Sequence, residues 1–284
     1  MSGICYLVGT PIGNLKDITL RALDTLKSVD VVASEDTRKS SVLLHAYGIK
    51  KPLISYYKQK EREGTEEIIA LLEQGKSVAL ITDAGMPAIS DPGAILVRSL
   101  RERGHKMEVV PGPTAVTSAI SLAGLTQDGF VFAGFLPQKK KEKDAILNNL
   151  KNVVLPLVFY CAPHDLDETL SYLFSKLGAR KARAIKEVTK LFETVYEGTL
   201  DTLTIENKKG EFVLIVDGAK ERGEEEQNEE AKALLLQYLT EGLSRSEAVK
   251  RAASETGAPK NSVYQMSLTL HDFTKQAGDE SRGK

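Results

Sequence analysis

Residues 77–93, with the sequence SVALITDAGMPAISDPG, join a short apolar run to a stiff loop. The apolar run has the composition of a buried strand. The loop after it contains two prolines, two glycines and two aspartates, which exclude a helix and an ordinary strand. Such a loop is either a plain turn or a rigid surface held against a ligand, because glycines allow close approach of the backbone and prolines stiffen it.

Strand-like runs alternate with helix-like segments on both sides of this stretch. Segments such as 17–29 and 64–75 carry apolar residues at helical spacing. This βαβα pattern predicts an α/β fold in which helices cover a mostly parallel sheet. The strands predicted for the first half of the chain are 4–10, 30–34, 52–57, 77–82 and 106–110.

The second half of the chain repeats the alternation with less regular spacing, which predicts a mixed sheet. Helix-like segments here include 142–150, 164–178 and 200–207. The predicted strands are 129–135, 155–161, 182–188, 192–199 and 210–219. The expected division into an N-terminal α/β domain, a second α/β domain and a tail is 1–120, 121–219 and 220–284.

The tail begins with 220–230, a charged segment without apolar side chains, which we predict to be a linker. Helix-like segments follow it. Ser244 or Ser246 can cap one of them, Gly257 can end it, and another begins near Lys260. Helix, short turn and helix form the outline of a helix-turn-helix. The outline fits nucleic-acid binding, but it fits a packing appendage or a dimer arm equally well.

The composition is that of a soluble globular protein, with 42% hydrophobic and 27% charged residues and a formal net charge of −1. A nucleic acid would therefore have to be met by a local basic patch. The candidates are 138–144 and 56–63. In the second of these, Tyr56 and Tyr57 either stack on a base or pack as the end of a strand.

The cysteines, the histidines and the length of the apolar runs argue against a metal-binding, a secreted or a membrane protein. Cys5 and Cys161 lie in apolar runs without C-x-x-C spacing, which predicts buried thiols in a reducing compartment. The four histidines lack metal-ligand spacing, so we expect no metal site. No apolar run reaches the roughly 18 residues of a membrane span, and no secretory leader is recognisable. We expect a cytoplasmic protein without a membrane partner.

Two further loops resemble the one at 82–93 in their glycine and proline content. They are GTPIGN (9–14) and PGPT (111–114), and the three loops follow the first, fourth and fifth predicted strands. The carboxyl ends of parallel strands share one edge, so we expect the loops to converge on one small molecule. A dinucleotide site is a weaker alternative, because Gly9 and Gly13 do not complete a G-x-G-x-x-G pattern.

The loops also carry a family resemblance. GTPIGN (9–14), SEDTR (34–38) and DAGMPAISDPG (83–93), in this order, resemble the tetrapyrrole methylase superfamily, and within it the branch that methylates ribosomal RNA. The similarity extends over nearly the whole chain, including PGPTAVTSAISLAGL (111–125) and the tail. It departs from the porphyrin enzymes at GTPIGN, where Asn14 replaces the acid of GxGPGD, and at their GGDP loop, which corresponds roughly to Asp83–Met86.

The resemblance implies a homodimer of chains in which two α/β domains hold S-adenosylmethionine in a cleft. It also implies methyl transfer to a ribose 2′-hydroxyl of a cytidine in the decoding region of small-subunit (16S) rRNA. The substrate is then either naked rRNA or the assembled small ribosomal subunit. The residues expected to bind the cofactor are Thr10, Pro11, Ile12, Gly13, Asp83, Ala84, Gly85, Ala88, Ile89, Pro113, Thr114, Ala115, Cys161, Ala162, Val188 and Thr189.

A ribose hydroxyl is a poor nucleophile at neutral pH, so a base or a nearby cation would help the transfer. Glu35 and Asp36 are candidate bases, with Arg38 or Lys190 as electrostatic partner. An equally good interpretation is that the acids at 35–36 only cap the helix after them. Two other functions stay open: a methylase of a tetrapyrrole precursor, and a non-catalytic module that binds RNA or the ribosome.

Overall fold

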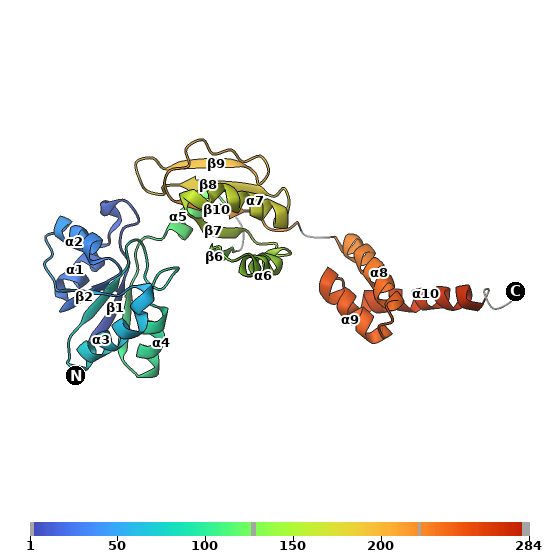
Figure 1. The fold of residues 1–284 in the computed structure, drawn as a ribbon, viewed down its shortest axis with the longest axis horizontal. Helices are drawn as coiled ribbons and strands as arrows, with labels where there is room; N and C mark the ends of the chain where they lie inside the picture. The colour runs from blue at the N-terminus through green and yellow to red at the C-terminus, as the bar shows by residue number, and fades with distance from the viewer. Residues whose placement is uncertain (1–2, 126–128, 221–222, 280–284) are drawn as a thin grey trace. The chain divides into compact units, whose positions relative to one another are not determined.

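The computed structural model of this chain describes residues 3–125, 129–220 and 223–279 (Figure 1). The chain forms two compact units, one that ends at Ala219 and one that begins at Lys220. The first unit contains two β-sheets with their helices, and the second is helical. The predicted α/β class and the helical character of the tail are confirmed.

The first sheet consists of β1 (Ile4–Val8), β2 (Val31–Ser34), β3 (Leu53–Ser55), β4 (Val78–Ile81) and β5 (Lys106–Val110). Its order is β3-β2-β4-β1-β5, and every neighbouring pair is parallel. All residues of β4 are buried, as expected of a central strand whose two faces are both covered. The strands β4, β1 and β5 are adjacent, so the three glycine- and proline-containing loops leave the same edge of the sheet.

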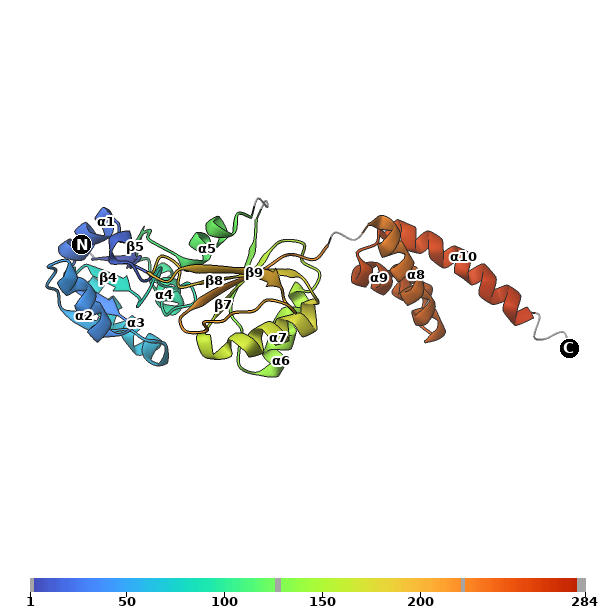
Figure 2. The ribbon, with the colours of Figure 1, turned by 90° about the horizontal axis from the view of Figure 1, so that it is seen from above.

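Helices lie on both faces of this sheet (Figures 1 and 2). On one face, Leu26 and Leu44 belong to a buried cluster with sheet residues such as Ile81. On the other face, Leu72 and Leu100 pack around residues such as Leu80. The helices are α1 (Leu20–Ser28) and α2 (Thr37–Ala46) on the first face, and α3 (Glu61–Glu73) and α4 (Ala94–Glu102) on the second, with short 3-10 turns η1 (Leu15–Asp17) and η2 (Lys58–Lys60).

The second sheet is mixed, as predicted. Its strands are β6 (Val131–Phe135), β7 (Leu157–Cys161), β8 (Lys181–Lys186), β9 (Thr194–Thr199) and β10 (Phe212–Val216). The order is β6-β7-β10-β8-β9, with β6 and β7 parallel and the other pairs antiparallel. Because β7 and β10 pair antiparallel, the carboxyl end of β7 and the amino end of β10 lie side by side at one edge of the sheet, with Cys161 opposite Phe212.

Both faces of the second sheet are also covered. Helices α6 (Lys140–Leu150) and α7 (Leu166–Leu177), with the turn η3 (Pro163–Asp165), pack on one face. Helix α5 (Ala115–Ala123) follows β5 in the chain, yet it packs on the other face of the second sheet through Val116 and Ala119. The segment between β5 and α5 therefore links the two sheets. The division at residue 120, within α5, stays a prediction.

Residues 200–207 contradict the sequence prediction, because they form turns and irregular chain rather than a helix. The Thr199 carbonyl accepts hydrogen bonds from the N–H groups of Thr202 and Leu203, and the Thr202 hydroxyl accepts one from Thr199 N–H at 3.1 Å. Threonine side chains that bond to nearby backbone compete with helix formation. Leu200 and Ile205 are instead buried in the core under the second sheet, which accounts for their apolar spacing.

The second unit contains α8 (Glu224–Thr240), α9 (Arg245–Thr256) and α10 (Lys260–Asp279), packed around buried residues such as Leu235 and Val249. The prediction of a linker at 220–230 was wrong for most of that segment, because α8 begins at Glu224. Ala231 and Leu235 anchor the helix in the core of the unit, and a helix that is anchored extends readily into neighbouring residues with good helix propensity.

The boundaries inside this unit follow the predicted signals. The Ser244 side chain accepts a hydrogen bond from Glu247 N–H at 3.3 Å, so Ser244 rather than Ser246 caps α9. Gly257 ends α9 with a left-handed φ of 77°, a conformation that suits glycine. The next helix begins at Lys260, as predicted.

The two cysteines are buried free thiols, as predicted. Burial raises the pKa of Cys5 to about 12 and that of Cys161 to about 11, so neither is a thiolate near neutral pH. Within the described part of the chain, no group of His, Cys, Asp and Glu side chains is arranged to hold a metal ion. Among the residues that the structure describes, no helix is long and apolar enough to cross a membrane.

Candidate functional site

The three loops at the carboxyl edge of the first sheet are hydrogen bonded to one another. Thr10 N–H donates to the Gly85 carbonyl at 2.9 Å, and Gly85 N–H donates back to the Thr10 carbonyl at 3.1 Å. Gly9 N–H donates to the carbonyl of Val110, directly before the third loop, at 3.0 Å. The three loops therefore meet at this edge, as predicted, and their convergence on one small molecule stays a prediction.

Close backbone contact explains two of the glycines in these loops. A Cβ atom added to Gly9 would lie 2.7 Å from Gly112 Cα and 2.7 Å from Met86 Sδ. A Cβ atom on Gly112 would in turn lie 2.9 Å from Gly9 Cα. The first and third loops thus touch through their main chains, and any side chain at either position would separate them.

The loop at 82–93 is held in an unusual conformation. Ala88 and Ser90 both have left-handed backbones, with φ values of 66° and 64°. Residues other than glycine pay for this conformation, so the surrounding contacts must hold it. Ala88 N–H donates to the Pro92 carbonyl at 3.2 Å, and Gly93 N–H donates to Glu61 Oε1 at 2.8 Å. These bonds fold the loop back on itself and turn its middle toward a cavity.

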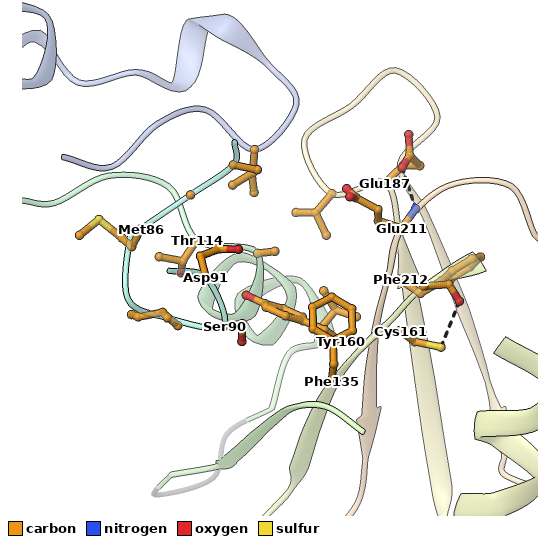
Figure 3. Close-up of a pocket in the computed structure, with 18 of the residues that line it drawn as sticks. Met86, Ser90, Asp91, Thr114, Phe135, Tyr160, Cys161, Glu187, Glu211 and Phe212 are labelled. Atoms are coloured by element: carbon orange, nitrogen blue, oxygen red, sulfur yellow. Dashed lines mark hydrogen bonds between the residues drawn. The ribbon is translucent and has the colours of Figure 1, made fainter. Parts of the chain in front are cut away.

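The cavity has a volume of about 260 Å³ and is enclosed by both sheets of the first unit (Figure 3). The first sheet contributes the loop residues, and the second contributes the ends of β6 and β7, the turn after β8 and the start of β10. Most of the lining is apolar, with three carboxylates, Asp91, Glu187 and Glu211, and one lysine, Lys190.

Most predicted cofactor residues border this cavity or its two neighbours. Those that line the first cavity are Ile12, Ala84, Gly85, Ile89, Thr114, Ala115, Cys161, Ala162 and Val188. Pro11, Gly13 and Asp83 line a second cavity of about 370 Å³, and Pro113 and Thr189 line a third. Thr10 and Ala88 border none of the three and instead hold the loops together, since the Thr10 hydroxyl donates to the Thr82 carbonyl at 3.1 Å.

Several lining residues were not predicted from the sequence. Tyr160 and Phe135 form an aromatic wall with Phe132, since the Tyr160 ring centroid lies 5.4 Å from that of Phe135 and 4.9 Å from that of Phe132. Ser90, Asp91 and Glu211 are the other polar additions. Only their positions in the sequence could have indicated them: Tyr160 directly precedes the predicted Cys161 in β7, and Asp91 lies inside the predicted loop.

Lys190 lies between the domain of the first sheet and the domain of the second sheet, and it borders both the first and the second cavity. Its Nζ lies 3.0 Å from Glu187 Oε1 and 3.0 Å from Glu211 Oε2. Burial opposes the charge on Lys190, but these two carboxylates outweigh it and raise the lysine pKa. The lysine stem crosses Gly13, where an added Cβ would lie 2.4 Å from Lys190 Cγ.

The turn that carries Lys190 is strained and pinned. Glu187 and Thr189 have left-handed φ values of 52° and 66°. The Thr189 hydroxyl donates to Asp17 Oδ2 of the first domain, and Glu187 Oε1 accepts Glu211 N–H at 2.9 Å. The position of Lys190 is therefore fixed from both sides of the cleft.

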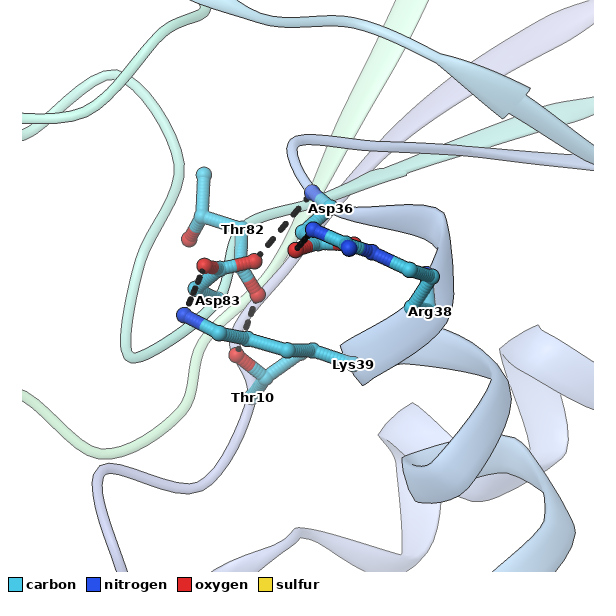
Figure 4. Close-up of polar contacts among 6 residues, drawn as sticks. All are labelled: Thr10, Asp36, Arg38, Lys39, Thr82 and Asp83. Atoms are coloured by element: carbon cyan, nitrogen blue, oxygen red, sulfur yellow. Dashed lines mark hydrogen bonds and ion pairs between the residues drawn. The ribbon is translucent and has the colours of Figure 1, made fainter.

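The candidate acids at 35–36 lie beside the loops but border none of the three cavities. Asp36 caps α2, and its carboxylate accepts Arg38 N–H at 2.9 Å and Arg38 Nε at 3.1 Å (Figure 4). Hydrogen bonds from Arg38 lower the pKa of Asp36 to about 2, which makes it a poor proton acceptor. Burial and the nearby Asp83 charge instead raise the pKa of Glu35.

Asp83 is paired with Lys39, whose Nζ lies 2.6 Å from Asp83 Oδ2 (Figure 4). Both residues line the second cavity. Thr82 lines it as well, and the Thr82 hydroxyl is buried without a hydrogen-bond partner among the described residues. Buried polar groups are normally satisfied, so this wall of the cavity is suited to a polar ligand group.

The two predicted basic patches differ in the structure. Tyr56 is only 1% exposed, and its hydroxyl lies 3.2 Å from Thr65 Oγ1, so it packs in the core and cannot stack on a base. Near the start of α6, Lys139, Lys140 and Lys141 are exposed. Lys143 is buried against Glu168, with Nζ 2.7 Å from Glu168 Oε1.

The fold and the site together define a two-domain α/β protein with a cavity where loops of the first domain meet the second. The chain belongs to the tetrapyrrole (corrin/porphyrin) methylase family, whose model matches residues 5–204, and it is a methyltransferase. Residues 225–271 match the model of an RsmI C-terminal HTH domain. The resemblance read from the loop sequences is confirmed.

Relatives of known name are similar over nearly the whole chain. Ribosomal RNA small subunit methyltransferase I of Bacillus subtilis (strain 168) is 42% identical, over 92% of this chain and 93% of the relative. The protein of the same name from Synechocystis sp. (strain ATCC 27184 / PCC 6803 / Kazusa) is 40% identical, over 94% and 98%.

Solved structures share the two-domain fold. Uroporphyrin-III-C-methyltransferase from Thermus thermophilus covers 76% of this chain and 94% of its own, with a TM-score of 0.54 and 25% identity. A diphthine synthase matches with a TM-score of 0.61 over 76% of this chain and 90% of its own, and its 15% identity shows the fold alone.

Proposed function

We propose that this chain transfers a methyl group from S-adenosylmethionine to the ribose 2′-hydroxyl of a cytidine in the decoding region of small-subunit rRNA. The observation that carries the proposal is a pair of adjacent cavities, which share the lining residues Ile12, Ala84, Lys190 and Glu211. One cavity suits the donor and the other an acceptor nucleoside. The names of the relatives support ribosomal RNA as the acceptor.

The residues of the first cavity fit the donor chemically. Ala84 and Gly85 offer backbone to a flat purine or ribose, and the apolar walls suit the adenine and the thioether stem. Thr114 and Ala115 form the amino-terminal end of α5, where N–H groups and the helix dipole suit a carboxylate. The carboxylates in the lining suit the positive sulfonium and ammonium groups. When bound, the donor supplies an activated methyl group.

Methyl transfer is an in-line displacement. The ribose oxygen forms a bond to the methyl carbon, the carbon–sulfur bond breaks with its electron pair moving to sulfur, and the hydroxyl proton passes to a base or to water. Positioning of the two substrates supplies much of the acceleration. Lys190 borders both cavities, so its charge favours the developing negative charge on the oxygen.

The acids at 35–36 have separate expected roles. We expect Glu35→Gln to slow single-turnover methyl transfer about tenfold or more, with little change in the Kd for the donor, because a group that accepts the proton acts only in the chemical step. We expect Asp36→Asn to change the rate less than twofold, because asparagine also caps a helix. Rapid-quench measurements with labelled donor test both.

Equal rates for wild type and Glu35→Gln would remove Glu35 from the mechanism. A large loss of the single-turnover rate in Asp36→Asn, with unchanged helix content by circular dichroism, would instead show that Asp36 takes part in the mechanism. A control is Glu66→Gln, since Glu66 pairs with Arg103 on the surface away from the cavities.

The RNA needs a larger surface than the cavities provide. The exposed lysines 139–141 and, in the second unit, Lys250, Arg251 and Lys260 supply local positive charge to phosphates. A homodimer in the cytoplasm that acts on naked rRNA or on the assembled subunit belongs to the same proposal. Because few phosphate contacts are involved, binding should weaken only moderately with salt.

The deciding experiment incubates the protein with methyl-labelled S-adenosylmethionine and one of three acceptors. These are small ribosomal subunits from cells lacking the activity, the naked rRNA from those subunits, and a porphyrin precursor. Nucleoside digestion followed by mass spectrometry should find 2′-O-methylcytidine in one or both RNA samples. Label in the porphyrin alone would establish the tetrapyrrole alternative, and no binding of the donor would establish the non-catalytic one.

A further inference from the structure

The carboxylate of Asp91 is the unusual group in the first cavity. Of the three carboxylates that line it, Glu187 and Glu211 both pair with Lys190. Among the described residues, no hydrogen bond or ion pair to a side-chain oxygen of Asp91 is found. A partly buried carboxylate without a compensating partner is unfavourable, so this position suits a cationic partner that arrives with the ligand.

The backbone directs this carboxylate into the cavity. Ser90, immediately before it, has a left-handed φ of 64°, and Ala88 has one of 66°. Pro92 follows Asp91, and its carbonyl accepts the hydrogen bond from Ala88 N–H at 3.2 Å that closes the loop. Backbone strain that contacts keep in place is typical of positions where a side chain must have a fixed direction.

The surroundings of Asp91 suit a cation with apolar substituents. The Asp91 and Tyr160 side chains point into the same cavity, with Phe135 beside Tyr160 (Figure 3). Aromatic faces attract cations, and the effect grows where water is excluded. A carboxylate next to an aromatic wall is thus suited to a sulfonium, whose charge is surrounded by carbon.

We propose, on the basis of the donor site in the proposed function, that the Asp91 carboxylate recognises the sulfonium charge and so lets the protein distinguish S-adenosylmethionine from its neutral thioether product, S-adenosylhomocysteine. Donor and product share the adenosine, the ammonium and the carboxylate, and differ in the methyl group and the sulfur charge. A carboxylate paired with the sulfonium favours the donor and leaves the spent product without that attraction, which assists its release.

The charged groups around Asp91 provide a second signature. Burial first, and then the negative charges of Glu35, Asp83 and Glu211, raise the pKa of Asp91 to about 6. The other ionisable groups of the cavity are Tyr160, Cys161, Glu187 and Lys190. Below pH 6 the Asp91 side chain is mostly neutral, and a bound cation favours the ionised form. Donor binding near pH 6 should therefore release part of a proton from Asp91, and product binding should not.

The first test measures Kd for donor and product by calorimetry with wild type, Asp91→Asn and the control Asp167→Asn, whose site lies exposed on α7. In Asp91→Asn the Kd for the donor should rise about tenfold, the effect of one pKa unit of coupling, and that for the product less than twofold. A ratio of donor Kd to product Kd unchanged from wild type would overturn the proposal. If both Kd values rose equally, Asp91 would instead lie at the shared ammonium.

The second test needs no variant, so it stands even where Asp91→Asn fails to fold. Binding enthalpies of the wild type at pH 6 are measured in buffers of different ionisation enthalpy. We expect about half a proton released with the donor and none with the product, and a donor Kd that rises as the pH falls below 6. Equal proton release with both ligands would overturn the proposal. Failure of both ligands to bind would instead overturn the proposed function.

Discussion

Replacing Lys190 by methionine is expected to slow single-turnover methyl transfer about 100-fold, the scale at which a preorganised charge at the reacting atoms acts. Lys190 borders both cavities, and its Nζ lies 3.0 Å from Glu187 Oε1 and 3.0 Å from Glu211 Oε2. Its loss removes the positive charge that borders both cavities, and it leaves Glu187 and Glu211 without their lysine partner.

Lys190→Met should not weaken binding of the donor, and this distinguishes a catalytic effect from a structural one. The two unpaired carboxylates make the cavity more negative, so the Kd for the positively charged donor should stay equal or fall. Lys190→Arg keeps the charge but presents a planar fork on a stem with one methylene fewer, so partial activity is expected. Lys208→Met is the matched control, because Lys208 pairs with the exposed Asp167 outside the cavities.

A rate within twofold of wild type for Lys190→Met would exclude a catalytic role. A tenfold higher Kd for the donor, with an unchanged rate at saturating donor, would show that the lysine only shapes the pocket. Circular dichroism and the thermal midpoint of each variant give the folding control, since Lys190 also sits in a turn with two left-handed residues, Glu187 and Thr189.

The first-domain half of the site was predictable because it depends on local sequence and one general rule. Buried parallel strands are read from apolar runs, and their carboxyl ends must share an edge. The three glycine- and proline-rich loops therefore had to meet, and the hydrogen bonds between Thr10 and Gly85 bear this out. The order β4-β1-β5 made the three loops direct neighbours.

The second-domain half depends on how one sheet packs beside the other, which local patterns do not encode. Tyr160 and Phe135 come from two strands, and only their parallel pairing brings the rings together. The direction of Asp91 depends on left-handed backbone at Ala88 and Ser90, a conformation that their residue types do not favour. Spacing in the sequence could mark the loop but not the side of it that faces a ligand.

The two incorrect segments failed for opposite reasons. At 200–207 the apolar spacing suggested a helix, but threonine hydroxyls bonded to the local backbone and the apolar residues filled the core from an irregular chain. At 220–230 the lack of apolar residues suggested a linker, but α8 begins at Glu224 because the helix is anchored further along at Ala231 and Leu235. In both cases tertiary contacts, rather than the residues in the window, decided the outcome.

Replacing Gly9 by alanine should separate the loops and lower donor affinity at least about tenfold. The added Cβ would lie 2.7 Å from Gly112 N, 2.7 Å from Gly112 Cα and 2.7 Å from Met86 Sδ. Two of these three atoms are backbone and cannot rotate away, so the first or third loop must shift. Overpacking of this kind also lowers the free energy of unfolding by about 1–3 kcal/mol. Calorimetric titration with the donor and urea unfolding measure the two effects.

The control is Gly129→Ala, where an added Cβ would meet only Leu155 Cδ1, at 3.9 Å. This substitution should leave both the Kd and the unfolding midpoint nearly unchanged. If Gly9→Ala weakened the donor only in proportion to its loss of stability, and saturating donor restored the wild-type midpoint, the close loop contact would serve folding alone. A donor Kd equal to that of wild type would contradict the site itself, because the contact between Gly9 and Gly112 fixes the first and third loops around the cavity that we assign to the donor.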